Sequence, residues 1–212
     1  MVGAEAMTHQ RSNPPVWFRL PPGFHDIGPG DRATLNAVAN ALNSPDAQHD
    51  LSLLMDGLEE LAGHDVVHTA IGLHPEEPNG VNTSLFSLTI RRAEQPNPRL
   101  TVARTALAIA GSPLWTSSVR RFVDLPSGLP CCQVAGTISV PDVEQGVFQA
   151  RIATVHPDGL HLLLLDLTSA SIQHADAYTD ILEAVAHTLL FTDPEPSVPP
   201  ATGTSRILEV LL

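Results

Sequence analysis

The residues of this chain that could do chemistry are few, and the two cysteines come first. Cys131 and Cys132 are adjacent and are the only cysteines. A disulfide between neighbours closes a strained ring, and two sulfurs cannot supply the four ligands of a structural zinc. A thiolate nucleophile needs a nearby cation to lower its pKa, and the nearest basic residues in the sequence are Arg120 and Arg121. Adjacent strand residues face opposite sides, so we expect one cysteine in the core, the other exposed, and neither catalytic.

Ten histidines suggest a metal site, but their spacing does not supply one. His64 and His68 are four residues apart, which would place them on one face of a helix; however, Gly63 ends the predicted helix before them. His156 and His161 flank a predicted turn and could approach each other across it, without a third ligand at a defined spacing. No His-Glu-x-x-His motif occurs. We therefore predict no metal, no cofactor and no catalytic residue.

Asp166 is the most interesting single polar residue, because it interrupts a leucine-rich strand. It shares one face of that strand with Leu162 and Leu164, while the neighbouring leucines line the other face. We expect Asp166 on the solvent side, where the strand leaves the core. The alternative is a buried carboxylate with a perturbed pKa, which would point to a function.

The remaining motifs favour loops over active sites. No Gly-x-Ser-x-Gly elbow occurs. Gly28-Pro29-Gly30 is similar to a phosphate-binding turn, but its proline removes a backbone donor that such a turn needs, so we predict a helix-entry loop. All eleven basic residues are Arg; without lysine, Schiff-base chemistry and a Walker-type phosphate loop are excluded.

Composition narrows the class of protein further. The 212 residues are 43% hydrophobic, which suits one folded domain, and carry a formal charge of −12, which argues against nucleic acid or an anionic membrane as the main partner. No apolar run is long enough to cross a bilayer, so we predict no membrane insertion. Residues 1–13 lack the features of a signal peptide, and we expect a cytoplasmic protein.

Hydrophobic periodicity predicts an α+β protein in which helices cover a curved antiparallel sheet. The order is a strand, a pair of helices, two strands, a helix, four strands and a last helix. The predicted strands are 16–20, 66–73, 85–91, 119–125, 132–140, 147–155 and 160–167, with a turn at 74–80. The predicted helices are a hairpin within 33–62, one helix from Pro98 to Gly111 with Leu100, Ala103, Leu107 and Ala110 on its buried face, and a last helix over 175–190.

The closing segment resembles a known family. The strands VFQARIATV and LHLLLLDLTS, and a helix that ends in HTLLF, resemble the final β-β-α of Mog1/PsbP-like domains, and the opening WFRLPPGF is similar to their first strand. The chain also resembles uncharacterised actinobacterial proteins that share WFxLPPGF, a PNPRL segment and a final FTDP, over about residues 16–194. The resemblance carries no catalytic residue set. It implies a Mog1/PsbP-like fold and a binding or accessory role.

We divide the chain into a flexible arm (1–15), one α+β domain (16–192), a proline-rich linker (193–205) and an apolar end (206–212). The leading hypothesis is a non-enzymatic protein-binding or adaptor protein. The alternative is a subunit, accessory or cargo factor of a larger assembly, such as a secretion or contractile injection apparatus or a protein shell. A hydrolase or thiol enzyme that uses Cys131 or Cys132 is a remote third. The oligomeric state and the partner's identity stay open.

The apolar end is the candidate partner-binding segment, through Ile207, Leu208, Val210, Leu211 and Leu212. Exposed aliphatic side chains invite aggregation, so these residues must be buried somewhere. They fold back on their own domain, or they enter a groove or sheet edge of a partner.

Deletion of residues 206–212 separates these two outcomes. If the segment docks on a partner, the shortened chain keeps its melting temperature and loses its co-purifying proteins. A lower melting temperature with unchanged recovery of partners would make the segment part of the fold.

Overall fold

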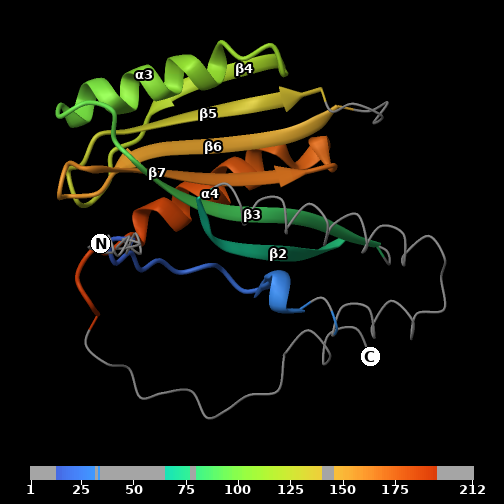
Figure 1. The fold of residues 1–212 in the computed structure, drawn as a ribbon. Helices are drawn as coiled ribbons and strands as arrows, with labels where there is room; N and C mark the ends of the chain where they lie inside the picture. Colours follow the sequence, from blue (N-terminus) through green and yellow to red (C-terminus); the bar gives the residue numbers. More distant parts are fainter. Residues whose placement is uncertain (1–12, 32, 34–64, 77–79, 140–145, 195–212) are drawn as a thin grey trace, which may run out of the picture.

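Seven antiparallel strands form one sheet in the computed structural model, in the order β1-β2-β3-β7-β6-β5-β4 (Figure 1). The structure describes residues 13–31, 33, 65–76, 80–139 and 146–194. The strands are β1 (Phe24–Asp26), β2 (Val66–Glu76), β3 (Gly80–Arg92), β4 (Trp115–Phe122), β5 (Cys131–Ile138), β6 (Val147–Val155) and β7 (His161–Ser169). The described helices are α3 (Pro98–Ala110), α4 (Ala175–His187) and the short 3-10 turns η1 (Pro29–Asp31) and η2 (Ile172–His174). The predicted α+β class and antiparallel sheet are confirmed.

The sheet carries a hydrophobic cluster on each of its two faces. On the α4 face, α4 packs on β6 and β7; on the α3 face, α3 packs on β4, β5 and β6. The larger cluster lies on the α4 face and includes Phe86, Leu88, Ile152, Leu163, Leu165 and Leu182. The smaller cluster lies on the α3 face and includes Val102, Ala106, Val134, Val155 and Leu164.

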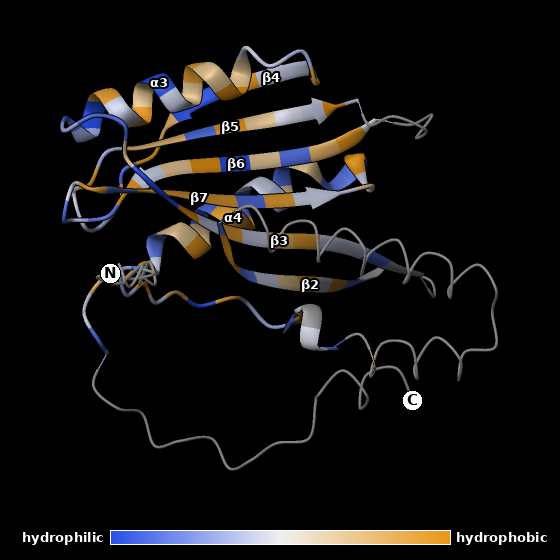
Figure 2. Ribbon diagram, viewed as in Figure 1, coloured by the Kyte–Doolittle hydropathy of each residue, from blue (hydrophilic) through white to orange (hydrophobic). Residues whose placement is uncertain are grey.

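Strand β7 lies at the centre, between β3 and β6, and is buried on both faces. Leu163, Leu165 and Leu167 belong to the α4-face cluster, whereas Leu164 belongs to the α3-face cluster. A strand covered on both sides needs an almost continuous apolar run instead of simple alternation. Figure 2 shows this run as hydrophobic colouring along the first part of β7. The predicted hairpin of β6 and β7 is confirmed.

Helix α4 presents the predicted face to the sheet. Tyr178, Leu182 and Val185 are buried on it, and Leu189 is buried just beyond its end. Ile181, predicted to lie on the same face, is only partly buried and packs against the edge of that cluster. The i, i+3, i+4 and i+7 spacing of these residues therefore places the helix correctly.

Helix α3 has the predicted ends but not the predicted buried face. The side chain of Asn97 accepts a hydrogen bond from the amide of Leu100 at 3.2 Å, and the helix ends at Gly111. The buried residues are Thr101, Val102, Ala106 and Ile109, while Leu100 and Leu107 are exposed. The prediction of a Leu100–Leu107 stripe is wrong because this helix is apolar on more than one side, so periodicity does not choose between the stripes.

Other boundaries also differ from the prediction. Residues 16–20 do not form a strand: only Trp17 pairs, with Leu190, through two backbone hydrogen bonds of 2.9 Å. Part of the predicted turn at 74–80 is strand, because β2 continues to Glu76 and β3 begins at Gly80. The predicted helices of 33–62, except Ala33, and the segments 195–205 and 206–212 lie outside the described residues. The division into arm, domain, linker and apolar end stays a prediction.

The core assignment of α4 predicts the effect of a truncation. Leu182→Ala removes most of a fully buried side chain, so we expect a loss of about 2–5 kcal/mol in the free energy of unfolding, measured by urea denaturation. Leu107→Ala is the matched control; Leu107 is 58% exposed, and its truncation should cost less than about 0.5 kcal/mol. Equal losses in the two variants would contradict the packing of α4.

Candidate functional site

Strand β4 ends the sheet and is the longest stretch of exposed strand in the described residues. It pairs with β5 on one side, and seven of its eight residues are exposed. Its Val119 is 72% exposed and its Phe122 is 81% exposed, more than any other large hydrophobic residue in the described part of the chain. The strand at the opposite end, β1, has only three residues. In Figure 1, β4 lies at one side of the sheet, next to α3.

The two exposed apolar side chains of β4 lie on opposite faces of the sheet. Val119 pairs with Ala135, which packs against the α4-face cluster, and Phe122 pairs with Cys132 of the α3-face cluster. Side chains directly opposite each other in an antiparallel pair share a face. An added strand would therefore find one apolar contact on each face of β4.

Both charged residues of β4 are arginines, Arg120 and Arg121, and they differ in their contacts. The guanidinium of Arg121 donates a hydrogen bond of 2.5 Å to the side chain of Gln133 and forms an ion pair with Glu183 of α4. Arg120 forms no ion pair with any residue that the structure describes. Arg120 therefore places a positive charge beside Phe122, on the strand whose outer side is left open. The other side of β4 pairs with β5.

Both cysteines are buried, so the expectation that one is exposed is wrong. Cys131 belongs to the α4-face cluster and Cys132 to the α3-face cluster; they do face opposite sides, but both sides are covered here. Burial raises the pKa of the Cys131 thiol to about 12, with Cys132 and Glu183 adding to the effect. Burial also raises the pKa of Cys132, against a smaller opposite effect of Arg120. Both thiols are therefore protonated at neutral pH, unlike a catalytic thiolate.

Asp166 is buried, so its expected position on the solvent side is also wrong. It does share a face with Leu164, as predicted, and is 8% exposed. It forms an ion pair and a hydrogen bond with Arg151 of β6, its partner in the β6–β7 register. Burial raises the pKa of the Asp166 carboxyl, and Arg151 and Arg91 offset part of that shift.

Two adjoining cavities lie on the α3 face beside this ion pair. One, of about 390 Å³, is lined by Arg91, Arg92, Arg104 and Arg151; the other, of about 350 Å³, shares Arg91 and Arg151 with it. Glu94 and Asp166 add negative charge to these linings. Four of the eleven arginines therefore gather around one face of an acidic chain.

Of the remaining residues singled out in the sequence, only one pair of histidines comes together among the described residues. Gly28-Pro29-Gly30 enters a 3-10 turn in which the amide of Gly28 donates to Asp31 at 2.9 Å, in line with the predicted loop. His68 lies on β2, 3.2 Å from Asp26, and His64 lies outside the described residues. His156 and His161 do approach each other across the β6–β7 turn, with ring centroids 6.2 Å apart.

The tail positions Ile207, Leu208, Val210, Leu211 and Leu212 also lie outside the described residues. None of the described helices is long and apolar enough to cross a membrane.

Sequence reasoning missed the edge position of β4. It predicted a strand at 119–125, but exposure depends on which strand ends the sheet, and that follows from long-range pairing. The crowding of Arg120 and Arg121 was the available signal, because charged residues are common on edge strands.

Comparison with known proteins gives a likeness in fold. No family model matches the chain, and no curated protein matches it. Among solved structures, the fold is similar to that of LpqN, described as involved in cell envelope biogenesis of Mycobacterium tuberculosis. The TM-score is 0.52 and the identity 13%, over 88% of each chain. At this identity the similarity shows the fold alone.

The buried ion pair predicts an asymmetric response to mutation. Arg151→Met leaves the buried Asp166 without its charge partner, and we expect a loss of about 3–5 kcal/mol in the free energy of unfolding at pH 7. In the double variant Arg151→Met/Asp166→Leu, no buried charge is left unpaired, so most of the loss should be recovered. Urea denaturation of the two variants and the unchanged chain measures both values.

The pH dependence of the Arg151→Met loss has a definite sign. Arg151 lowers the pKa of the Asp166 carboxyl, so this carboxyl binds its proton more tightly in the folded Arg151→Met variant than in the folded unchanged chain. The loss is therefore largest above the folded pKa of the variant and shrinks as the pH falls from there to the folded pKa of the unchanged chain, because the unfolded state is the same in both. A loss that does not change with pH would contradict a buried, charged Asp166.

Proposed function

We propose that this chain is a non-enzymatic binding protein that receives an extended segment of a partner protein along the open edge of β4. The observation that carries the proposal is the exposure of Val119 and Phe122 on the strand that ends the sheet. An extended peptide adds to such an edge through main-chain hydrogen bonds, and alternate side chains supply specificity.

The charge of the edge favours an acidic partner. Arg120 has no ion-pair partner among the described residues, and opposite charges stabilise cross-strand pairs. A second copy of β4 would bring its own Arg120 and Arg121 to the same edge, where like charges repel. The partner strand therefore places apolar residues opposite Val119 and Phe122, three positions apart, and Asp or Glu between them.

Two further observations support a binding role over an enzymatic one. The thiol enzyme considered above needs an accessible thiolate, whereas both cysteines are buried with raised pKa values. The likeness in fold to LpqN, a protein involved in cell envelope biogenesis, is compatible with an accessory role. A Mog1/PsbP-like relationship and a cytoplasmic location are part of the proposal.

The second hypothesis, a subunit or accessory factor of a larger assembly, rests on the apolar residues Ile207–Leu212. That segment lies outside the described residues, so the hypothesis keeps only its argument from the sequence. The two hypotheses use different surfaces, which a comparison of β4 variants with a tail deletion distinguishes.

A peptide library tests the edge directly. We expect the full chain, panned against random 12-residue peptides displayed on phage, to enrich sequences with two apolar residues three positions apart and acidic residues between them. Val119→Asp/Phe122→Asp places carboxylates on the edge and should weaken binding of the selected peptides at least tenfold. Because both side chains are exposed, the melting temperature should stay within a few degrees.

Leu107→Asp is the matched control, since Leu107 is also an exposed apolar residue but lies on α3. It should bind the peptides as the unchanged chain does. Equal binding of the selected peptides to the β4 variant and to the unchanged chain would contradict the proposal. So would self-association in sedimentation that the β4 variant abolishes, because the occupant would then be a second copy.

A further inference from the structure

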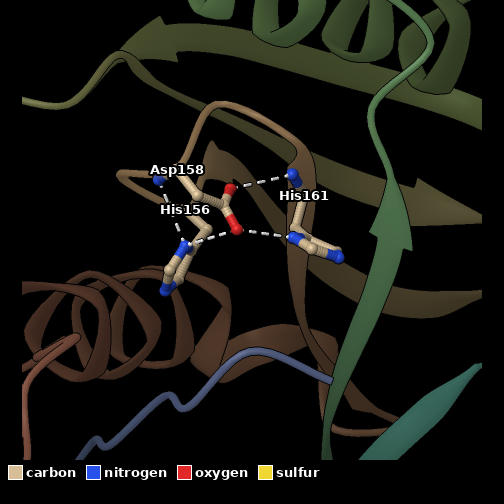
Figure 3. A group of neighbouring side chains, drawn as sticks. All are labelled: His156, Asp158 and His161. Atoms are coloured by element: carbon tan, nitrogen blue, oxygen red, sulfur yellow. Dashed lines mark hydrogen bonds and ion pairs between the residues drawn. The ribbon is translucent and has the colours of Figure 1, made fainter. Parts of the chain in front are cut away.

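The turn between β6 and β7 brings two histidines and an aspartate together (Figure 3). Nδ1 of His156 lies 3.0 Å from Oδ2 of Asp158, and Nδ1 of His161 lies 2.7 Å from the same oxygen. One ligand atom from each residue lies within 4.8 Å of the other two. The spacing is His-x-Asp-x-x-His, so the third ligand absent from the sequence argument lies inside the turn itself.

The backbone of the turn holds the aspartate in place. Oδ1 of Asp158 accepts hydrogen bonds from the amides of Leu160 at 2.7 Å and His161 at 3.2 Å, which leaves Oδ2 directed at the two rings. Partial burial by itself would raise the pKa of Asp158, but the Leu160 amide and the two histidines lower it below its usual range. The carboxylate is therefore charged at neutral pH, as a metal ligand must be.

The hydrogen bonds of His156 leave a mismatch at Nδ1. That atom accepts a hydrogen bond of 3.2 Å from the amide of Asp158, which requires a lone pair, and it also lies 3.0 Å from a carboxylate oxygen. A lone pair facing a carboxylate oxygen is unfavourable without a proton or a cation between them. A cation bound by both atoms removes the mismatch, and it takes the single lone pair of Nδ1 in place of the Asp158 amide.

The side chain of His156 is well held for this role. It is 11% exposed, and its ring makes a T-shaped contact with Phe191, with centroids 5.0 Å apart. Its Nε2 is buried and has no hydrogen-bond partner among the residues that the structure describes. The ring therefore presents Nδ1, the atom on the side of the turn, as the nitrogen that can reach a ligand.

We infer that His156, Asp158 and His161 form a binding site for Zn²⁺ at the β6–β7 turn, with Nδ1, Oδ2 and Nδ1 as ligands. Two imidazoles and one carboxylate are a usual three-residue set for this ion, and a water or a small anion completes the tetrahedron. Zinc bonds of about 2.0–2.1 Å place tetrahedral ligand atoms about 3.3 Å apart. Oδ2 lies 2.7 and 3.0 Å from the two Nδ1 atoms, and all three ligand atoms lie within 4.8 Å of one another, so side-chain rotations must bring them to that value when the ion binds.

The site is independent of the β4 edge and does not hold the fold together. Its three ligands lie within one tight turn, and the sheet has its own hydrophobic clusters on both faces. The positive groups nearby are Arg91 and Arg92, which line a cavity of about 380 Å³ with His161. Their charge favours an anion as the fourth ligand and limits the affinity for the cation.

Competition with a chromogenic zinc indicator tests the site on the full chain with Zn²⁺ as the probe. We expect one equivalent bound with micromolar affinity. His161→Gln removes a ligand without touching the Asp158 hydrogen bonds to the backbone, and it should lower the affinity at least tenfold. Asp158→Asn should do the same and still accept the amide hydrogen bonds. The matched control is His187→Gln, an exposed histidine at the end of α4, which should bind zinc as the unchanged chain does.

Thermal melting is a second measurement of zinc binding, and it also applies to a variant that is less stable than the unchanged chain. Zinc should raise the melting temperature of the unchanged chain and of His187→Gln, because it binds only the folded state, but not that of His161→Gln. Zinc that binds equally to His161→Gln and Asp158→Asn would overturn the inference, since the ligands would then be other histidines. Failure of the unchanged chain to bind one equivalent would overturn it as well.

Discussion

The burial of β7 on both faces is the constraint on which the rest of the structure depends. Leu163, Leu165 and Leu167 need the cover of α4. Leu164 lies on the opposite face, in the cluster that α3 forms with residues of β5 and β6. A central strand of this kind requires paired strands on each side, and β3 and β6 supply them. The hairpin of β6 and β7 also brings Arg151 opposite Asp166, so the one charge on the central strand has a partner.

The same arrangement leaves β4 at an edge. The chain adds β5 and β4 outward from β6, and no described element pairs with the outer side of β4. Exposed hydrophobic edges invite association with other strands, and Val119 and Phe122 increase that tendency. The arginines favour partners that bring negative charge to this edge.

The sequence predicted the positions of helices and strands better than the burial of their side chains. Local signals such as the Asn97 cap and the turn at His156–Gly159 were enough to place α3 and the last hairpin. The buried cysteines, the buried Asp166 and the open edge depend on which strands meet across the sheet, and a pattern of apolar residues does not contain that information. The proposed zinc ligands lie within six residues of sequence. Only the structure shows that the β6–β7 turn directs Oδ2 of Asp158 toward both rings.

Hydrogen–deuterium exchange of the full chain, without a partner, tests the open edge most directly. The account predicts that the amides of β7 exchange most slowly. In β4, amides that pair with β5 should exchange at an intermediate rate, and the outward-facing amides should exchange almost as fast as those of an unfolded peptide. Uniform protection of β4 in the monomer, equal to that of β7, would show that the edge is already covered and would contradict the account.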